Sequence, residues 1–104
     1  MFRTTIMAAA AAALVATSGP GLAASKKETD CTHQAAVVAA VQKARLDRVR
    51  ERQVKETVLA GEVTWPERYN AAIPLFTAEV YKLKMKDVKN TDISAQWMDV
   101  CMAN

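Results

Sequence analysis

The sequence predicts a single all-helical domain, a small bundle of about four helices closed by one disulfide bond. Two observations support this prediction. Apolar residues recur at the three- and four-residue spacings of amphipathic helices, and the sequence contains 2 cysteines, Cys31 and Cys101, that lie far apart in the chain. The N-terminal segment has a different character and predicts an exported precursor.

Residues 1–24 have the order of segments that is typical of secretory signal peptides. A positive charge at the N-terminus is followed by an apolar run from Ile6 to Ala16 and by small residues that end at Ala24. The apolar run is shorter than the roughly 20 residues that a membrane-spanning helix needs, and Gly19-Pro20-Gly21 should break it. We therefore expect cleavage after Ala24, a periplasmic or secreted product, and no transmembrane segment in the mature chain.

The domain that remains, residues 25–104, has a small positive charge. Removal of the signal peptide takes away Arg3 and no acidic residue, so the formal net charge falls from +3 to +2. This excess is far below the basic footprint of nucleic-acid-binding proteins, and we expect no nucleic-acid partner. It agrees better with an unidentified protein or an anionic envelope surface as the partner.

A domain of this size benefits from a covalent cross-link. Domains of about 80 residues bury only about 60–65% of the surface of the unfolded chain, so a single core gives thin stability. In an oxidising compartment, an even pair of cysteines without a local motif predicts one disulfide. The expected bond joins Cys31 to Cys101.

The first helix is expected to begin after a short charged segment, residues 25–29. Asp30 can cap the free N–H groups of its first turn. The alanines and valines from Ala35 to Val41 favour a helix that is apolar over a wide arc. This helix should be central and the most buried.

The highly charged segment 43–56 allows two interpretations. The first helix could continue with a charged outer face, or the chain could turn near residues 46–50 and form a second helix. We prefer the turn, because the apolar stripe of the first helix does not continue in phase to Val54 and Val58. Gly61 would then supply the left-handed conformation that favours a helix end.

A third helix is predicted to begin at Thr64-Trp65-Pro66-Glu67, which matches a capping box with proline in the first turn. Pro74 lies inside the helix and should kink it or split it into a short piece and a longer one. The apolar stripe of this helix is formed by residues spaced by three and four, namely Tyr69, Ile73, Phe76, Val80 and Leu83.

The C-terminal part predicts one more helix. Residues 81–86 alternate between apolar residues and lysines, a period that could indicate an extended stretch. Asn90-Thr91-Asp92 then has turn and capping chemistry, so a final helix should follow it. The residues expected on the buried face of that helix are Ile93, Trp97, Val100 and Cys101.

No arrangement of residues in the sequence specifies a reaction. Cys31, His33 and Cys101 are possible metal ligands, but residues two apart on a helix face different ways and no fourth ligand is evident. The motifs of thiol redox proteins and of serine hydrolases are absent. We expect no enzyme activity, no catalytic residues, no metal and no cofactor. A thiol redox or metal-handling protein that uses these three residues is the alternative hypothesis.

Two basic segments could bind an anionic partner. The first, residues 43–55, contains acidic residues at helical spacings and can pair internally, so the second is the better candidate. Among the aromatic residues, Tyr69, Phe76 and Trp97 fall on predicted buried faces. Trp65 is expected to be partly exposed and is the candidate contact aromatic. The lysines of the second segment are Lys82, Lys84, Lys86 and Lys89.

The chain resembles a loose class of small exported bacterial proteins of unassigned function. These have a signal peptide, a cysteine at the start of the first helix, a helix that ends in an Ala-Arg pair, and a cysteine in the final helix; here the matching residues are Cys31, Ala44-Arg45 and Cys101. It is more distantly similar to the periplasmic acid-stress chaperones, although it is mildly basic. The resemblance implies export and a disulfide. The leading hypothesis is a non-enzymatic binding or envelope-stress and assembly factor.

Overall fold

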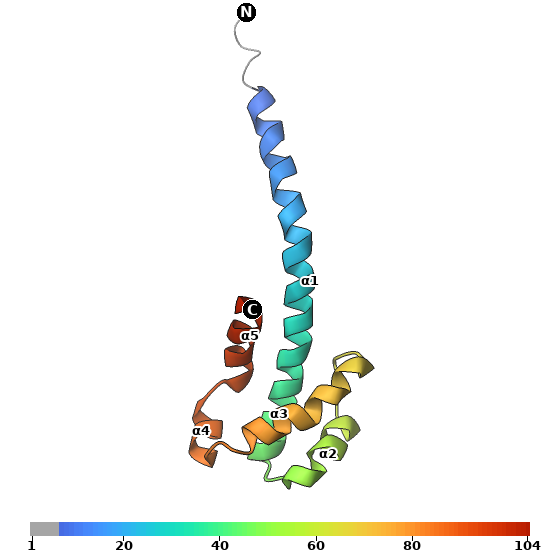
Figure 1. The fold of residues 1–104 in the computed structure, drawn as a ribbon, viewed down its shortest axis with the longest axis vertical. Helices are drawn as coiled ribbons and strands as arrows, with labels where there is room; N and C mark the ends of the chain where they lie inside the picture. Colours follow the sequence, from blue (N-terminus) through green and yellow to red (C-terminus); the bar gives the residue numbers. More distant parts are fainter. Residues whose placement is uncertain (1–6) are drawn as a thin grey trace, which may run out of the picture.

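The computed structural model describes the backbone of residues 7–104 and the side chains of residues 26–104. Every regular element in this part is helical, which confirms the predicted all-helical bundle (Figure 1). The elements are α1 (Met7–Leu46), a 3-10 helix (Glu51–Gln53), α2 (Val54–Ala60), a second 3-10 helix (Glu67–Ala71), α3 (Ala72–Val80), α4 (Met85–Asn90) and α5 (Ile93–Ala103).

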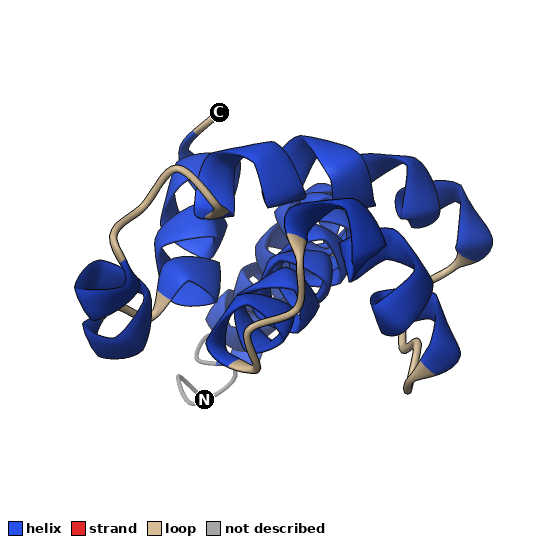
Figure 2. Cartoon of the chain, turned by 90° about the horizontal axis from the view of Figure 1, so that it is seen from below, coloured by secondary structure: helices blue, strands red, loops and turns tan. Residues whose placement is uncertain are grey.

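Helix α1 is the axis of the fold. Its N-terminal half extends beyond the other helices, and its C-terminal half lies among them (Figures 1 and 2). The alanine and valine run explains this position, because its small side chains let neighbouring helices approach closely. Val37 and Val41 are 0% exposed and form the core together with Ile73 of α3. The expectation of a central, buried first helix is confirmed.

The start of this helix differs from the sequence-based expectation. α1 runs without interruption from Met7, so Gly19-Pro20-Gly21 does not break it and the charged segment 25–29 is helical. Asp30 is therefore not an N-cap in this chain. Its carboxylate instead accepts a hydrogen bond from the Gln34 amide at 3.1 Å.

The predicted signal peptide, residues 1–24, lies outside the residues whose side chains the structure describes, and cleavage after Ala24 stays a prediction. Of the helices that the structure describes, none combines the length and hydropathy that crossing a bilayer requires.

The preferred turn after α1 is confirmed, and an unexpected residue makes it. Arg48 has a φ of 63°, the left-handed region that usually belongs to glycine. Its N–H donates to the carbonyl of Arg45 at 3.0 Å, and the N–H of Val49 donates to the carbonyl of Ala44 at 3.0 Å. These two bonds define a Schellman motif with an arginine in the glycine position.

This geometry predicts that Arg48→Gly stabilises the protein. A residue with a Cβ is disfavoured in the left-handed region by roughly 1 kcal/mol, so the glycine variant should gain about 0.5–1 kcal/mol in the free energy of unfolding. Arg48→Ala keeps the Cβ while it removes the charge and should gain nothing. Urea unfolding of both variants provides the measurement. Equal stability of the two variants would contradict the assignment of strain to the backbone.

Two of the local signals after α2, Gly61 and Thr64, do not act as expected. Gly61 has a φ of −94°, so it does not adopt the left-handed conformation. Thr64 does not form a capping box, because the 3-10 helix begins at Glu67 and its N-cap, Pro66, lacks a side-chain cap bond. The expected division near Pro74 is present, because the short 3-10 helix Glu67–Ala71 precedes the longer α3, and Pro74 lies in the first turn of α3, where a missing N–H costs no helical bond.

The segment between α3 and α5 contains a helix that the sequence analysis missed. Residues 81–84 form a turn, and α4 follows where the alternating pattern suggested an extended stretch. The Gln42 side chain on α1 donates to the carbonyls of Val88 and Thr91 at 2.7 and 2.8 Å, which holds α4 against α1. Asp92 caps α5 by accepting a backbone N–H at 3.1 Å, as expected.

Candidate functional site

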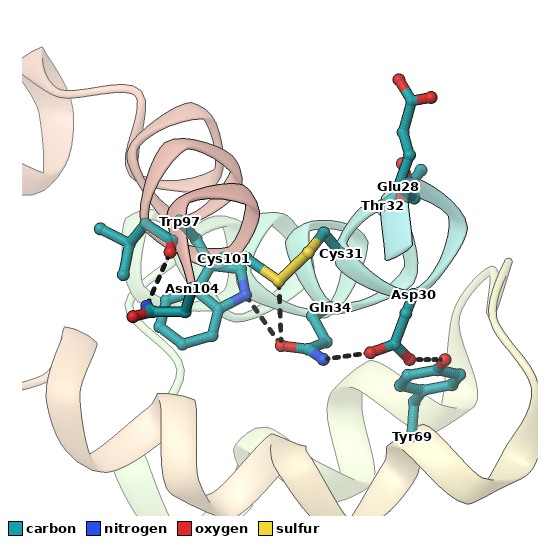
Figure 3. The surroundings of a disulfide bond; sticks show 10 residues. Glu28, Asp30, Cys31, Thr32, Gln34, Tyr69, Trp97, Cys101 and Asn104 are labelled. Carbon is teal, nitrogen blue, oxygen red and sulfur yellow. Dashed lines mark hydrogen bonds between the residues drawn. A yellow bond between two sulfur atoms is a disulfide. The ribbon is translucent and has the colours of Figure 1, made fainter. Parts of the chain in front are cut away.

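The predicted disulfide between Cys31 and Cys101 is present and joins α1 to α5. Cys31 is 1% exposed, so the bond lies inside the contact between the two helices. Beside it, the Trp97 indole N–H donates to the Gln34 side-chain oxygen at 3.0 Å (Figure 3). The Gln34 amide nitrogen donates to Asp30 within α1, which orients the Gln34 side chain. The covalent bond and the Trp97–Gln34 hydrogen bond together hold α5 along α1.

His33, the third residue of the alternative redox or metal hypothesis, has an aromatic neighbour. The His33 ring packs against Tyr69, with the ring centroids 5.1 Å apart. Cys31 and Cys101 are bonded to each other, so neither offers a thiolate ligand. Within residues 26–104, no group of three or more His, Cys, Asp or Glu side chains gathers in a way that could hold a metal ion.

Tyr69 connects the second 3-10 helix to α1. Its hydroxyl donates to the Asp30 carboxylate, and the Arg68 guanidinium donates to the Tyr69 oxygen at 3.1 Å. The pKa of the Tyr69 hydroxyl is raised above its ordinary value. The larger cause is the hydrogen bond to Asp30, and the second is burial of the hydroxyl. The protonated hydroxyl is therefore the form that the folded protein favours.

This raised pKa predicts a loss of stability in alkali. An unfolded tyrosine ionises with a pKa of about 10.0, so the unfolded chain releases this proton at a lower pH than the folded one. The stability from the Tyr69 hydroxyl is complete below about pH 10 and is lost as pH rises through the folded pKa. Urea midpoints measured across this range should fall more steeply for the wild type than for Tyr69→Phe. Parallel profiles would contradict the role of this hydroxyl.

Two basic segments meet at the end of the molecule away from the N-terminus. The first comprises the last turn of α1, the connection to α2 and the start of α2, and the second comprises the turn before α4 and α4 itself (Figure 1). We refer to their cationic side chains together as the basic end: Arg45, Arg48, Arg50, Arg52, Lys55, Lys82, Lys84, Lys86 and Lys89.

The two segments of the basic end are held together by specific contacts. The Tyr81 hydroxyl donates to the carbonyl of Val49 at 2.6 Å. The Arg45 guanidinium donates to the carbonyl of Leu83 at 3.4 Å and lies 5.0 Å from the centre of the Tyr81 ring. Burial raises the pKa of the Tyr81 hydroxyl, so it remains a donor. The two segments are far apart in the sequence, and these contacts make them one surface.

Most cations of the basic end have no carboxylate partner within the described side chains. Lys82 pairs with Glu79 at 3.0 Å, and the internal pairing expected for the first segment is limited to Lys43 with Asp47 at 2.7 Å. A hollow of about 670 Å³ opens between the first segment and α3. The basic residues that line it are Arg50, Arg52 and Lys55.

A second surface feature is an apolar groove between α3 and α5, with α1 as its floor. It encloses about 680 Å³, and we call it the α3–α5 groove. Leu75 is 70% exposed and Val100 is 51% exposed, although Val100 was expected on the buried face of α5. Phe76 and Trp97 meet edge to face in the groove, with their ring centroids 5.0 Å apart. The other apolar residues that line it include Val38, Val80 and Ile93.

The candidate contact aromatic is not available for contact. Trp65 is 6% exposed, whereas partial exposure was expected, and its indole N–H donates to the Asn70 side chain at 2.8 Å. The groove aromatics, Phe76 and Trp97, are half-buried instead. One signal could have found the groove: Leu75 is a large apolar residue out of phase with the buried stripe of its helix.

Comparison of the chain with protein-family models, with curated proteins and with solved structures found no match. The class of protein is therefore defined by the structure itself. It is an all-helical domain in which a disulfide joins the first and last helices, with a basic end and an apolar groove on its surface.

Proposed function

We propose that this chain is an exported, non-enzymatic binding protein that attaches to an anionic envelope surface through its basic end. The observation that supports this proposal most directly is the joining of two basic segments that are distant in sequence. Each Lys or Arg close to an anionic lipid surface contributes about 1 kcal/mol of attraction. Segments that act on one surface at the same time add these contributions, so their juxtaposition matters more than the net charge.

The distribution of charge over the rest of the protein supports a directed attachment. Outside the two segments that form the basic end, residues 44–55 and 81–90, the described part of the chain holds eight acidic residues and four basic ones. A molecule with a strong positive end and a weakly negative remainder is turned by an anionic surface before contact. The basic end would then reach the surface first.

The hollow in the basic end suits a phosphate headgroup. Arg50 and Arg52 line it together with Lys55, and a guanidinium matches the geometry of phosphate oxygens through paired N–H groups. Glu51 is the acidic residue on its lining. Within the described side chains neither arginine forms an ion pair with that carboxylate, so both remain available to a headgroup.

The alternative hypothesis, a thiol redox or metal-handling protein, needs a cysteine pair that partners can reach. Cys31 is 1% exposed, so its sulfur is a poor target for an attacking thiolate, and Cys101 is half-buried against α1. The proposal therefore assigns the cysteines a structural role and assigns no reaction to the protein.

Co-sedimentation with lipid vesicles tests the proposal. The protein should bind vesicles that contain one third phosphatidylglycerol and should not bind vesicles of phosphatidylcholine alone. The double variant Lys84→Glu/Lys86→Glu should weaken binding at least about tenfold, because two attractive charges become repulsive. Raising the salt concentration should weaken the wild-type interaction through screening.

A matched variant separates the basic end from net charge. Lys26→Glu/Lys27→Glu changes the charge by the same amount, on exposed residues of α1 that lie about 30 Å along the helix from its C-terminal end. This variant should retain most of the binding. Equal losses in the two double variants, or equal binding to both kinds of vesicle, would refute the proposed role of the basic end.

A further inference from the structure

The α3–α5 groove has the composition of a binding surface. Monomeric proteins rarely leave large contiguous apolar patches in contact with water, and such patches mark sites of interaction. Here Leu75 and Val100 project from the two walls at 70% and 51% exposure, and half-buried aromatic rings lie between them. None of these side chains belongs to the basic end.

The walls of the groove are fixed before any partner arrives. The disulfide ties α5 to α1, and the bond from Trp97 to Gln34 holds the indole in place (Figure 3). The amide of Gln34 is already engaged with Asp30 and Trp97. A groove with preformed walls loses little conformational entropy on binding.

The charges along the two walls are all of one sign. Helices α3 and α5 contain Glu79 and Asp99 and not one Lys or Arg, and Asp92 lies at the start of α5. Asp92 and Asp99 are four and three residues from Gln96, so they lie on the same side of α5 as that groove residue. Glu79 pairs with Lys82 at 3.0 Å. Exposed pairs of this kind are weak, so another cation can replace the lysine.

From this combination we infer that the α3–α5 groove receives an amphipathic helix of another protein, with an apolar face and with Lys or Arg side chains along its edges. The apolar face fills the space between Leu75 and Val100, and the basic edges meet Glu79 and Asp99. Recognition of this kind places apolar residues of the partner at spacings of three and four in the groove. Opposite charges at the rim then select the partner's orientation.

A second copy of this chain fits the groove less well. In a symmetric dimer the same patch faces itself, so Glu79 and Asp99 of both copies would come together in one seam. Like charges in such a position oppose association. The cations that could compensate them lie mainly on the basic end.

Selection from a display library of helical peptides tests the inference. Each peptide carries an apolar stripe, and the residues that flank the stripe vary among Lys, Ser and Glu. The disulfide-bonded protein should enrich peptides with lysine flanks. Binding of the selected peptides to Val100→Asp should be at least about tenfold weaker, which corresponds to a loss of about 1.4 kcal/mol. The double variant Glu79→Gln/Asp99→Asn should reduce the preference for lysine over serine flanks.

Matched variants keep the result independent of folding. Leu59→Asp places the same charge on an exposed apolar residue of α2, 37% exposed and outside the groove, and it should bind the peptides as the wild type does. Leu75→Asp provides a second groove variant at a position that is 70% exposed. Circular dichroism confirms that each variant retains its helices.

Three results would overturn the inference. The first is a selection in which no peptide binds the wild type more tightly than it binds Val100→Asp. The second is enrichment of peptides with glutamate or uncharged flanks. The third is a dimer in sedimentation equilibrium that dissociates in Val100→Asp, which would assign the groove to a second copy of the chain.

Discussion

Reduction of the disulfide is expected to lower the free energy of unfolding by about 4 kcal/mol. Cys31 and Cys101 are separated by 70 positions in the sequence. A cross-link over such a distance restricts the unfolded chain far more than the folded one. Small domains have a total stability of only about 5–15 kcal/mol, so this single bond accounts for a large share.

Urea unfolding of the oxidised and the reduced wild-type protein measures this effect without any change of sequence. The double variant Cys31→Ala/Cys101→Ala, measured without reductant, should be about as unstable as the reduced protein. A difference of less than about 1 kcal/mol between oxidised and reduced protein would contradict the expected role of the bond.

Ile73→Ala is expected to destabilise the protein by about 3 kcal/mol. Ile73 is 0% exposed and packs in the core where α3 crosses α1. Its truncation removes buried apolar contacts and leaves a cavity, the combination that makes large-to-small core substitutions costly. The measurement is again urea unfolding, at neutral pH and with the disulfide intact.

Leu75→Ala is the matched control for this prediction. Leu75 lies two residues further along the same helix, on the other side of Pro74, but it is 70% exposed. Its truncation should change the free energy of unfolding by less than about 0.5 kcal/mol. If the two variants were equally stable, the face of α3 that packs against α1 would have been assigned wrongly.

The sequence was sufficient to predict the helices that have strong amphipathic stripes. The alanine and valine run predicted the central helix. The spacing of Tyr69, Ile73 and Val80 predicted the buried face of the second 3-10 helix and α3, and all three residues are buried. Asp92 was recognised as a cap because its side chain acts on its own helix. Such local signals need no knowledge of the neighbouring elements.

The local signals that proved wrong were overruled by neighbouring structure. Asp30 could have capped a helix, but the helix continues past it and its carboxylate receives the Tyr69 hydroxyl, 39 positions away in the sequence. The left-handed turn was expected at Gly61 and occurs at Arg48, where the Schellman bonds require it. Propensity is a weak prior when tertiary contacts compete with it.

The candidate sites were only partly predictable for the same reason. The four lysines of the second basic segment could be recognised from their density in the sequence. Their union with the first segment depends on contacts of Arg45 and Tyr81 that no periodicity indicates. The α3–α5 groove depends on the placement of two helices. Leu75, out of phase with the buried stripe of its helix, is a local sign of it, whereas Val100 was in phase with the expected buried face of α5 and gave none.

The cross-link also turns the chain from Cys31 to Cys101 into a closed loop. A protease that cuts once in the exposed connection between α2 and the following 3-10 helix, near Glu62, opens this loop but releases no fragment. The nicked molecule gains the mass of one water, and its two pieces separate only when a reductant is added. In a compartment rich in proteases, the protein therefore remains a single covalent unit after a first cleavage.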